Sequence, residues 1–539
     1  MASRVGLPLL DRATVDGDTF VLIPKARRAV PATLHPSLRP APADDVVPRM
    51  PDRRPGAGEQ YRFHFDMDAC IGCKCCVVAC NEQNGNPASI NWRRVGDIEG
   101  GFYPNVAHAH LSMSCNHCLE PTCLQGCPVD AYSKDDATGI VQHSADTCIG
   151  CQYCTWNCSY GAPQFNPERG VVGKCDMCHG RLELGQSPAC VSACPQGAIR
   201  IEIVDSADWR ARVAEGAAAS GAPAGDHSLS TTRVTLPADL PVNVRPVDLT
   251  QVKPEHPHWP LVVMTVLTQL SVGAFTAVWL LQLLGASTRL GLLAFCALLV
   301  GGLALGASTL HLGRPAYAYR ALKMWRRSWL SREVLLFTAF SGAAGVYAGL
   351  LLFDLPGSVV AGALTTTLGV GGVLASACIY RVPARPGWNT RHTLAQFLLT
   401  AAILGPLFAA VVGAGDRRWL ALAAAWMAGV QVVLFAVQFF AYNASDNLAL
   451  KGTARLLSSV LARRVIVCGA LLVVGAVALP ILTLTSGPDG LSATAVTFVT
   501  IGALLCALAA EVLGRYLFFV SVVPQHQALP YVAVGSEAA

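Results

Sequence analysis

Charged residues are scarce in this sequence: only 14% of its 539 residues are Asp, Glu, Lys or Arg. The 40 basic residues barely outnumber the 35 acidic ones, and a net charge of +5 is too small to indicate binding to nucleic acid. Hydrophobic residues make up 53% of the chain. This average conceals two unlike parts, one rich in cysteine and one built of long apolar segments.

We also expect no export signal. The first residues, MASRVGLPLLDRATVDG, contain no basic region followed by a sustained apolar stretch and a small-residue cleavage site. The pair Arg53-Arg54 precedes Pro55 and Gly56 instead of a hydrophobic stretch, which argues against a twin-arginine signal. Residues 1–60 are rich in Pro, Ala and Arg, so we expect an extended or partly disordered arm there.

Cysteines are concentrated in one part of the chain, where 17 of the 21 lie between Cys70 and Cys194. Sixteen of them form four groups, and only Cys75 is left over. The first group (Cys70, Cys73, Cys76, Cys80) and the third (Cys148, Cys151, Cys154, Cys158) share the spacing C-x2-C-x2-C-x3-C. The second (Cys115, Cys118, Cys123, Cys127) and the fourth (Cys175, Cys178, Cys190, Cys194) have longer central spacings, and a proline follows each.

Three kinds of site could use these cysteines. Disulfides need an oxidising compartment, and repeated cysteines separated by two residues have poor disulfide geometry. Structural zinc takes two ligands from each of two well-separated C-x2-C pairs, which only the fourth group resembles. Three cysteines in successive C-x2-C steps instead suit three corners of a [4Fe–4S] cube, whose fourth ligand is a remote cysteine often followed by proline. We therefore expect iron–sulfur clusters.

Sixteen ligands are enough for four [4Fe–4S] clusters. In two-cluster ferredoxins the fourth cysteine of each group binds the other cluster, and the nested order pairs the first group with the fourth and the second with the third. The predicted ligand sets are Cys70, Cys73, Cys76 and Cys194; Cys175, Cys178, Cys190 and Cys80; Cys115, Cys118, Cys123 and Cys158; and Cys148, Cys151, Cys154 and Cys127. Because no acid, base or nucleophile of a substrate pocket accompanies them, we expect an electron-transfer subunit without a catalytic site.

Apolar segments fill the chain from Trp259 onward. They lie near residues 259–284, 290–310, 333–353, 357–378, 393–413, 419–441, 465–485 and 491–513. Each has about twenty residues or more, enough to cross a hydrocarbon core of roughly 30 Å. Eight such segments would leave a soluble protein without a polar surface, so the sequence predicts an eight-helix transmembrane bundle.

The predicted fold class therefore has two parts, one α+β and one all-α in a membrane. A double ferredoxin-like iron–sulfur domain (61–203) follows the arm. A linker or partner-docking tail (204–256) leads to the membrane anchor (257–520), and residues 521–539 form a C-terminal tail.

The charges of the loops predict the orientation of the bundle. Loops 311–332, 379–392 and 442–464 carry 6, 3 and 4 Lys or Arg residues, whereas the alternate loops carry only Arg289, Arg417 and Arg418. By the positive-inside rule, the iron–sulfur domain is expected on the cytoplasmic side of a bacterial inner membrane.

Histidines are missing from the middle of the apolar segments, since those of this half lie at helix ends or in loops: His256, His258, His311, His392 and His526. A b-type haem in an anchor needs histidines inside facing helices, so we expect no haem. The membrane redox partner is then expected to be a quinone in the lipid phase.

His311, in STLHLGRP, and Glu333, in WLSREV, are the candidate quinone residues. Ionisable groups at a membrane boundary are costly and often functional, and a histidine near a carboxylate suits the proton release of quinol oxidation. The alternative is structural: His311 ends one helix, and Glu333 lies in the first turn of the next, where the helix dipole favours it. Glu511 and Arg515, four residues apart, predict a structural ion pair.

The motifs SCNHCLEPTC (114–123), CIGCQYCTWNC (148–158), YGAPQFNPERG (160–170) and KCDMCHGRLELGQSPACVSACPQGAI (174–199) resemble the iron–sulfur subunit of dimethyl sulfoxide reductase-type molybdoenzymes. This resemblance, over about residues 60–202, implies a domain that relays electrons between a membrane subunit and a molybdopterin catalytic subunit. Relatives with Trp at position 151 carry a three-iron cluster, so Cys151 implies four complete cubes. Ser159 stands where the family usually has proline, which alters a turn but no ligand.

The segments HWPLVVMTVLTQLSVGAF (258–275), STLHLGRPAYAYRAL (308–322) and EVLGRYLFF (511–519) resemble the haem-free anchor subunit of the same family. There the matching histidine and glutamate are associated with menaquinol, which implies that role for His311 and Glu333. The chain is thus expected to pass electrons from menaquinol to a separate molybdenum- or tungsten-pterin subunit. Two alternatives remain open: the reverse flow, from a formate-type dehydrogenase to quinone, and a structural membrane protein with zinc modules.

Overall fold

The computed structural model describes residues 12–15, 18–21, 48–214, 228–237, 240–241, 245–247, 252–286, 288–485 and 492–525. The chain divides into two units, Met1–Pro48 and Arg49–Ala539. In the first unit, strand β1 (Arg12–Val15) pairs antiparallel with β2 (Asp18–Val21). The remainder of the predicted arm up to residue 47, much of the predicted linker, and residues 526–539 of the predicted tail lie outside the described residues.

A three-stranded sheet joins the two ends of the cysteine-rich part. Its central strand is β3 (Glu59–Asp66), with β10 (Ile199–Asp205) antiparallel on one side and β11 (Arg233–Thr235) parallel on the other. The side chains of Tyr61, Phe63 and Phe65 alternate along β3 and are buried in the core of this part. Because β11 comes from the predicted linker, part of that segment belongs to the folded domain.

Short helices and hairpins carry the cysteines between β3 and β10. The helices are α1 (Cys75–Asn84), α2 (Thr122–Gly126), α3 (Tyr153–Asn157), α4 (His179–Glu183) and α5 (Ala189–Ser192), and α6 (Ser206–Ala214) follows β10. The hairpins are β4 (Arg94–Phe102) with β5 (Asn105–Met113), β6 (Tyr132–Lys134) with β7 (Val141–His143), and β8 (Gln164–Asn166) with β9 (Val171–Gly173); β12 (Arg245–Pro246) pairs with β4.

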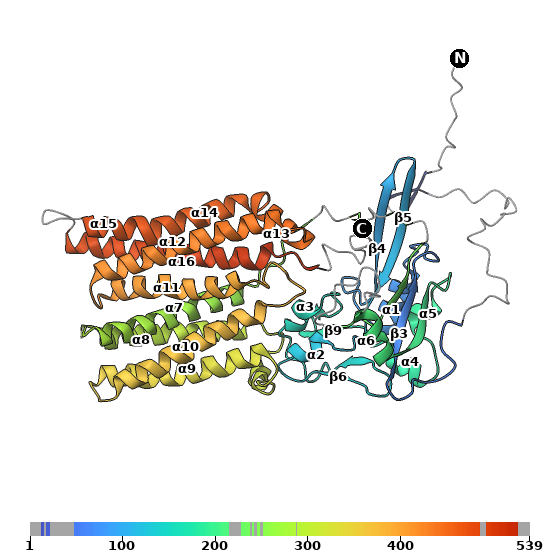
Figure 1. Cartoon of the computed structure of the whole chain (residues 1–539), viewed down its shortest axis with the longest axis horizontal. Helices are drawn as coiled ribbons and strands as arrows, with labels where there is room; N and C mark the ends of the chain where they lie inside the picture. Colours follow the sequence, from blue (N-terminus) through green and yellow to red (C-terminus); the bar gives the residue numbers. More distant parts are fainter. Residues whose placement is uncertain are drawn as a thin grey trace, which may run out of the picture. The chain divides into compact units, whose positions relative to one another are not determined.

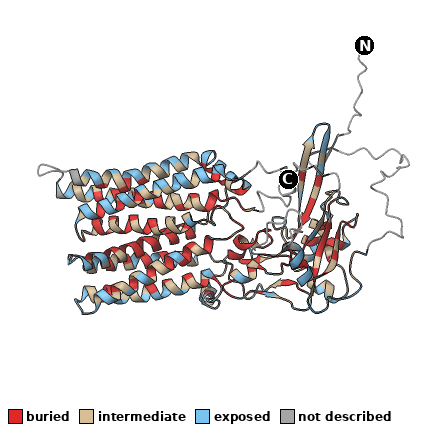
Figure 2. Cartoon of the chain, viewed as in Figure 1, coloured by how far each residue is buried: buried red, intermediate tan, exposed pale blue. Residues whose placement is uncertain are grey.

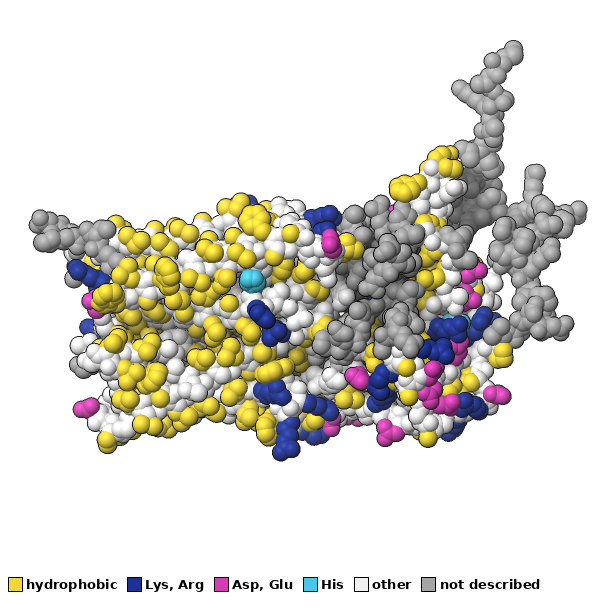
Figure 3. Space-filling model, viewed as in Figure 1, with side chains coloured by type: hydrophobic (Ala, Val, Ile, Leu, Met, Phe, Trp, Pro, Cys, Tyr) yellow, Lys and Arg dark blue, Asp and Glu magenta, His cyan; other side chains and the backbone are white. Residues whose placement is uncertain are grey.

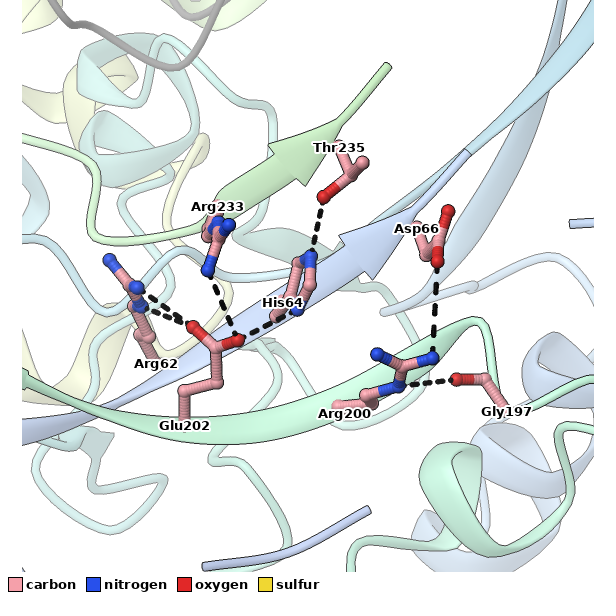
Figure 4. Close-up of polar contacts among 8 residues, drawn as sticks. All are labelled: Arg62, His64, Asp66, Gly197, Arg200, Glu202, Arg233 and Thr235. Atoms are coloured by element: carbon pink, nitrogen blue, oxygen red, sulfur yellow. Dashed lines mark hydrogen bonds and ion pairs between the residues drawn. The ribbon is translucent and has the colours of Figure 1, made fainter. Parts of the chain in front are cut away.

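Glu202 on β10 ties the strands of the three-stranded sheet together (Figure 4). Its carboxylate accepts a hydrogen bond of 2.9 Å from Arg62 Nε and lies 2.7 Å from His64 Nδ1, both on β3. Arg233 of β11 lies 3.6 Å away, and His64 also contacts Thr235 Oγ1 at 2.8 Å. Burial alone would raise the pKa of Glu202, but the hydrogen bond from His64 and the charge of Arg62 lower it to about 2.

Eight helices of the described chain are long and apolar enough to cross a membrane, as the sequence predicts (Figure 1). They are α7 (Trp259–Leu283), α8 (Leu290–Thr309), α9 (Trp329–Leu352), α10 (Ser358–Tyr380), α11 (Arg391–Val412), α12 (Arg417–Ala444), the continuous span of α14 (Ala462–Val473), a π-helical turn (Val474–Ala478) and α15 (Leu479–Thr485), and finally α16 (Ala493–Ser521). A 3-10 helix, η3 (Pro315–Leu322), precedes α9, and the amphipathic α13 (Leu448–Ser458) lies between α12 and α14.

Helix α7 is the central helix of the bundle, and it is buried along most of its length (Figure 2). Gly273 on α7 and Gly405 on α11 let these helices touch, because a Cβ on Gly405 would lie 2.4 Å from the Gly273 carbonyl oxygen. The outer helices expose hydrophobic side chains over the visible face of the bundle, whereas charged side chains gather near its ends and over the cysteine-rich part (Figure 3). This distribution suits a bundle surrounded by lipid.

Glu511 and Arg515 on α16, the predicted ion pair, interact electrostatically, but their hydrogen-bond partners lie on other helices. The Glu511 carboxylate accepts hydrogen bonds from Thr400 Oγ1 (2.6 Å) and Gln431 Nε2 (2.8 Å). Arg515 donates to Gln269 Oε1 (2.8 Å), and its guanidinium lies 3.7 Å from the centre of the Phe397 ring. Both charged groups are buried inside the bundle, and their hydrogen bonds join α16 to other helices.

Replacing Glu202 by glutamine is expected to lower the free energy of unfolding of the cysteine-rich part at pH 7 by about 2 kcal/mol, because Arg62 and His64 lose their counter-charge. A carboxylate with a lowered pKa stabilises the fold above its ordinary pKa of 4.5, and this contribution disappears as the pH falls from about 4.5 towards 2. Urea titrations of the detergent-solubilised chain at several pH values measure this. The exposed Glu183→Gln is the control, and equal urea midpoints for both variants and the wild type at pH 7 would contradict the assignment.

Candidate metal centres and their contact with the membrane helices

Three of the four predicted ligand sets each line one cavity. The first cavity is bounded by Cys70, Cys73, Cys76 and Cys194; the second by Cys115, Cys118, Cys123 and Cys158; and the third by Cys127, Cys148, Cys151 and Cys154. In each case the structure brings the remote fourth thiol to the three that follow one another in the chain. The leftover Cys75 lines none of these three cavities, and its side chain is exposed on α1.

The remaining set, Cys80, Cys175, Cys178 and Cys190, is close enough for its thiolates to affect one another. Burial raises the pKa of Cys80, and the neighbouring charges of Cys175 and Cys190 raise it further. Burial likewise raises the pKa of Cys178 to about 12, and Cys175 and Cys190 again add to the shift. A cation bound among such crowded thiols displaces their protons, because its positive charge offsets the mutual repulsion that raises their pKa values.

Backbone amides point at several of the sulfur atoms. Gly150 N donates to Cys148 Sγ and Met177 N to Cys175 Sγ, both at 3.4 Å, and Ala131 N donates to Cys127 Sγ at 3.3 Å. The tight loops that make these bonds need left-handed residues, which Gly150 and Met177 supply with φ angles of 69° and 59°. Such N–H···S bonds stabilise thiolate ligands and tune the potential of an iron–sulfur cluster.

Two buried cations stand among the cysteines, and sequence reasoning missed both. Arg93 is fully buried; burial alone would lower its pKa, but the thiolates of Cys190 and Cys76 raise it. Its guanidinium donates to Ser112 Oγ at 3.1 Å and to Ser114 Oγ at 2.9 Å. Both hydroxyl groups are neutral, so the negative charge that compensates Arg93 comes from the thiolates.

Lys174 is a second buried cation, and it lies among other cysteines. Burial opposes its charge, whereas the thiolates of Cys115 and Cys123 raise its pKa. Its ammonium group donates to the carbonyl oxygens of Val141 and Cys175. In the sequence, Lys174 differs from other lysines only in its position directly before Cys175. Nothing in the sequence distinguishes Arg93 from its neighbour Arg94. The excess of buried positive charge fits anionic clusters held by thiolates.

The third cavity lies against the end of the helical bundle. Gly150, in the loop between Cys148 and Cys151, accepts a hydrogen bond from Gly313 N at 3.4 Å, and Ile149 O accepts one from Arg314 N at 3.1 Å. A Cβ on Gly313 would lie 2.1 Å from the carbonyl oxygen of Gly170. The two backbones therefore meet without side chains between them, only two residues beyond His311.

Polar contacts extend this junction along the loop before α9. Arg327 lies 2.6 Å from Asp130, and Lys323 lies 3.6 Å from the same carboxylate. Arg314 donates to Ala145 O at 2.8 Å, and Arg320 to Asp146 O at 3.1 Å. Four of the six basic residues in the loop 311–332 thus bind the cysteine-rich part.

His311 and Glu333 both lie near this junction, but each binds its own partners. His311 Nδ1 donates to the carbonyl oxygen of Ser308, and burial lowers the pKa of His311 to about 4. Glu333 is buried in the first turns of α9, and its partner is the hydroxyl of Ser376 on α10. Leu330 and Val334, on either side of Glu333, pack against the core that contains Cys148 and Cys154.

An aromatic cluster fills the rest of the junction and has no signal in the sequence. Trp156 on α3, between Cys154 and Cys158, has its ring centre 5.4 Å from His258, 5.7 Å from Tyr380 and 5.5 Å from Trp388. These residues come from three segments that are far apart in the sequence, so only folding brings them together. The cluster gives the cysteine-rich part a dry contact with the bundle.

Two family models match separate segments of the sequence. One described as "4Fe-4S dicluster domain" matches residues 106–203, and one described as "DMSO reductase anchor subunit (DmsC)" matches residues 253–520. The first match contains the second, third and fourth cysteine groups, and the second contains the long helices almost completely. The matches confirm the predicted iron–sulfur domain and the predicted multi-pass membrane bundle.

Curated relatives match the cysteine-rich part. One chain of the anaerobic dimethyl sulfoxide reductase of Haemophilus influenzae is 39% identical over 156 residues, which are 27% of this chain and 76% of the relative. One subunit of the sulfite dehydrogenase of Allochromatium vinosum is 36% identical over 160 residues, covering 26% of this chain and 67% of the relative. The formate dehydrogenase iron–sulfur subunit of H. influenzae is 38% identical over 153 residues, or 25% of this chain and 49% of the relative.

Two neighbouring cysteines on α1 give a matched test of the metal sites. Cys76→Ser is expected to remove the iron bound by its set, about a quarter of the total if the four sets are equivalent, because a cluster needs all four thiolates. Cys75→Ser should keep the full iron content, since this thiol is exposed and outside the cavity. Iron and acid-labile sulfide are measured in anaerobically purified protein. Equal losses in both variants, or a zinc content in place of iron, would contradict the assignment.

Proposed function

Because the protein belongs to the family of dimethyl sulfoxide reductase-type iron–sulfur subunits, here fused to the anchor subunit, we propose that it carries electrons from menaquinol to a separate catalytic subunit. The observation that carries this proposal is the junction itself. The cysteine set with Cys148 and Cys151 lies directly against the loop that holds His311 and the helix that holds Glu333.

The four cysteine sets would hold four [4Fe–4S] clusters. The three cavities that three of these sets line support this number. Such clusters exchange single electrons, and the chain supplies their thiolates, their N–H···S bonds and the compensating charges of Arg93 and Lys174. We expect electrons to pass among the sets and to need no haem. The described spanning helices have no histidine that could serve as an axial ligand except His392, which lies at the start of α11.

His311 is suited to receive a proton from menaquinol. Since Nδ1 donates to the carbonyl oxygen of Ser308, the proton of the neutral ring sits on Nδ1, and Nε2 is left as an acceptor. With a pKa lowered to about 4, the ring is neutral at pH 7 but is a weak base, so it takes the proton as the electrons leave and the quinol hydroxyl becomes much more acidic. Oxidation of one quinol releases two protons and two electrons, and the buried Glu333 is the proposed acceptor of the second proton.

The proposed partner is a molybdenum- or tungsten-bis-pterin subunit, because the relatives are named as single chains or subunits of a reductase and of dehydrogenases. A second candidate function is electron flow in the reverse direction, from a dehydrogenase to quinone. The similarity to a formate dehydrogenase iron–sulfur subunit, nearly equal to that to the reductase chain, supports this candidate. Co-purification with the catalytic subunit from the native host would distinguish the two by the substrate that partner accepts.

We further propose that the protein resides in the bacterial inner membrane with the iron–sulfur domain in the cytoplasm. Glu255 N bonds Val520 O at 2.9 Å and Gln525 N bonds Ala384 O at 2.9 Å, so the chain enters and leaves the bundle at the same end. That end carries the loops rich in Lys and Arg, which favours the cytoplasmic side.

His311→Arg is expected to slow the reduction of the clusters by menaquinol about 100-fold, because the variant loses a neutral proton acceptor beside the quinol. Reduction by dithionite, which needs no quinol site, should be unchanged. The exposed His256→Arg is the control for an added charge near the bundle. Stopped-flow absorbance under anaerobic conditions gives both rates, and wild-type quinol kinetics in His311→Arg would remove this site from the account.

A further inference from the structure

A cavity of about 260 Å³ lies among α11, α12, α13, α14 and α16. None of the segment from His311 to Glu333 contributes to its wall. The wall is mostly apolar, and the polar side chains that interrupt it are those of His392, Gln396, Gln431, Gln438, Tyr442, Thr453 and Ser521. A cavity of this kind, apolar with a few converging polar groups, is typical of a small-molecule site.

The polar groups of the cavity suit a neutral head group. Among the described residues that line it, none is Lys, Arg, Asp or Glu, so a lipid phosphate would find no counter-charge there. Gln431 Nε2 donates to Glu511 at 2.8 Å, but Gln431 Oε1 is buried without a hydrogen-bond partner in the described part of the chain. An unpaired buried acceptor is costly, and Gln431 is one of the residues that line the cavity.

The cavity also opens towards the lipid. Val432 and Phe435 of α12 line it and are 42% and 40% exposed on the surface of the bundle. A ligand with a compact polar ring and a long hydrocarbon tail could therefore leave its tail in the bilayer. An isoprenoid quinone or quinol has this form, with two oxygen atoms on a ring and no charge.

Aromatic side chains connect the cavity with the cysteine sets. Trp388 and Phe518 belong to its wall and stack at 5.3 Å with an angle of 16° between their rings. Trp388 in turn meets the edge of Trp156 at 5.5 Å, and Trp156 lies between Cys154 and Cys158. A ring bound in the cavity is thus separated from the proposed clusters by two tryptophans.

We infer that this cavity is a second quinone-binding site, which takes the ring of an isoprenoid quinone or quinol beside Gln431 and Gln438 and its tail towards the exposed side of α12. The inference rests on the proposed function, since it assumes that the protein uses a quinone of the membrane. It lies between other helices than the site of His311 and Glu333, and its wall offers neutral polar groups in place of a carboxylate.

Gly469 on α14 offers a way to fill the cavity without disturbing its walls. It lines the cavity, and a Cβ there would meet no described atom within 4 Å. Gly469→Leu therefore places a side chain in the space proposed for the quinone ring. Gly429→Leu is the matched control, because Gly429 on α12 has equally open surroundings but does not line the cavity. Gln438→Leu is the second variant, which removes a polar group without adding bulk.

The test is photolabelling with an azido-menaquinone in nanodiscs, followed by mass spectrometry of the labelled peptides. The wild type and Gly429→Leu should show label both in residues 311–333 and in α12. In Gly469→Leu and Gln438→Leu the α12 label should fall about tenfold while the other label stays. Iron content and dithionite reduction, unchanged in these variants, show that they are folded.

Each other outcome overturns a defined statement. Label near His311 but none in α12 of the wild type would overturn the second site and leave the proposed function standing. Absence of label from both residues 311–333 and α12 in the wild type would contradict the proposed quinone function itself. Label in α12 that persists in both cavity variants would overturn the inference. Label in α12 from an azido-phospholipid that excess menaquinone does not displace would also overturn it and would assign the cavity to lipid.

Discussion

Backbone meets backbone at the end of the bundle, and this contact sets the position of one cysteine set beside the membrane helices. Gly150, Gly170 and Gly313 come from three segments and meet so closely that a Cβ on any of them would lie within 2.4 Å of a neighbouring carbonyl oxygen. This contact holds the loop of Cys148 and Cys151 against the loop that follows His311. Electron transfer becomes rapidly slower with distance, so the thinnest possible separation between a cluster and the membrane requires glycine on both sides of the junction.

Charged side chains have different uses in the three parts of the structure. Buried Arg93 and Lys174 lie among thiolates, and the basic loop before α9 binds Asp130 and backbone carbonyl oxygens of the iron–sulfur domain. The basic residues of that loop therefore have a structural role. For this reason they are weaker evidence for the orientation in the membrane than the basic residues of the loops 379–392 and 442–464. Inside the bundle, Glu511 and Arg515 each bind neutral partners and tie α16 to α7, α11 and α12.

The features that were predictable from sequence are those set by local spacing. The proposed ligand sets come from short cysteine intervals and their nested order; in the structure three of the sets each line one cavity, and the thiols of the fourth affect one another electrostatically. The eight spans follow from hydropathy, although the last one continues to Ser521 instead of ending near residue 513. Strand β11 inside the predicted linker, the aromatic cluster of Trp156 and the separate partners of Glu511 and Arg515 were not predictable. Each depends on residues brought together from distant segments, for which one sequence carries no periodic signal.

The most direct test of the account is the rate at which menaquinol reduces the clusters when the junction is opened. Gly313→Val places a branched side chain against the carbonyl oxygen of Gly170, whereas Gly306→Val, one turn before the end of α8, meets open space and serves as the control. Gly313→Val is expected to lose most of the quinol-dependent rate while its iron content and its reduction by dithionite stay as in the wild type. Unchanged quinol kinetics in Gly313→Val would contradict the account.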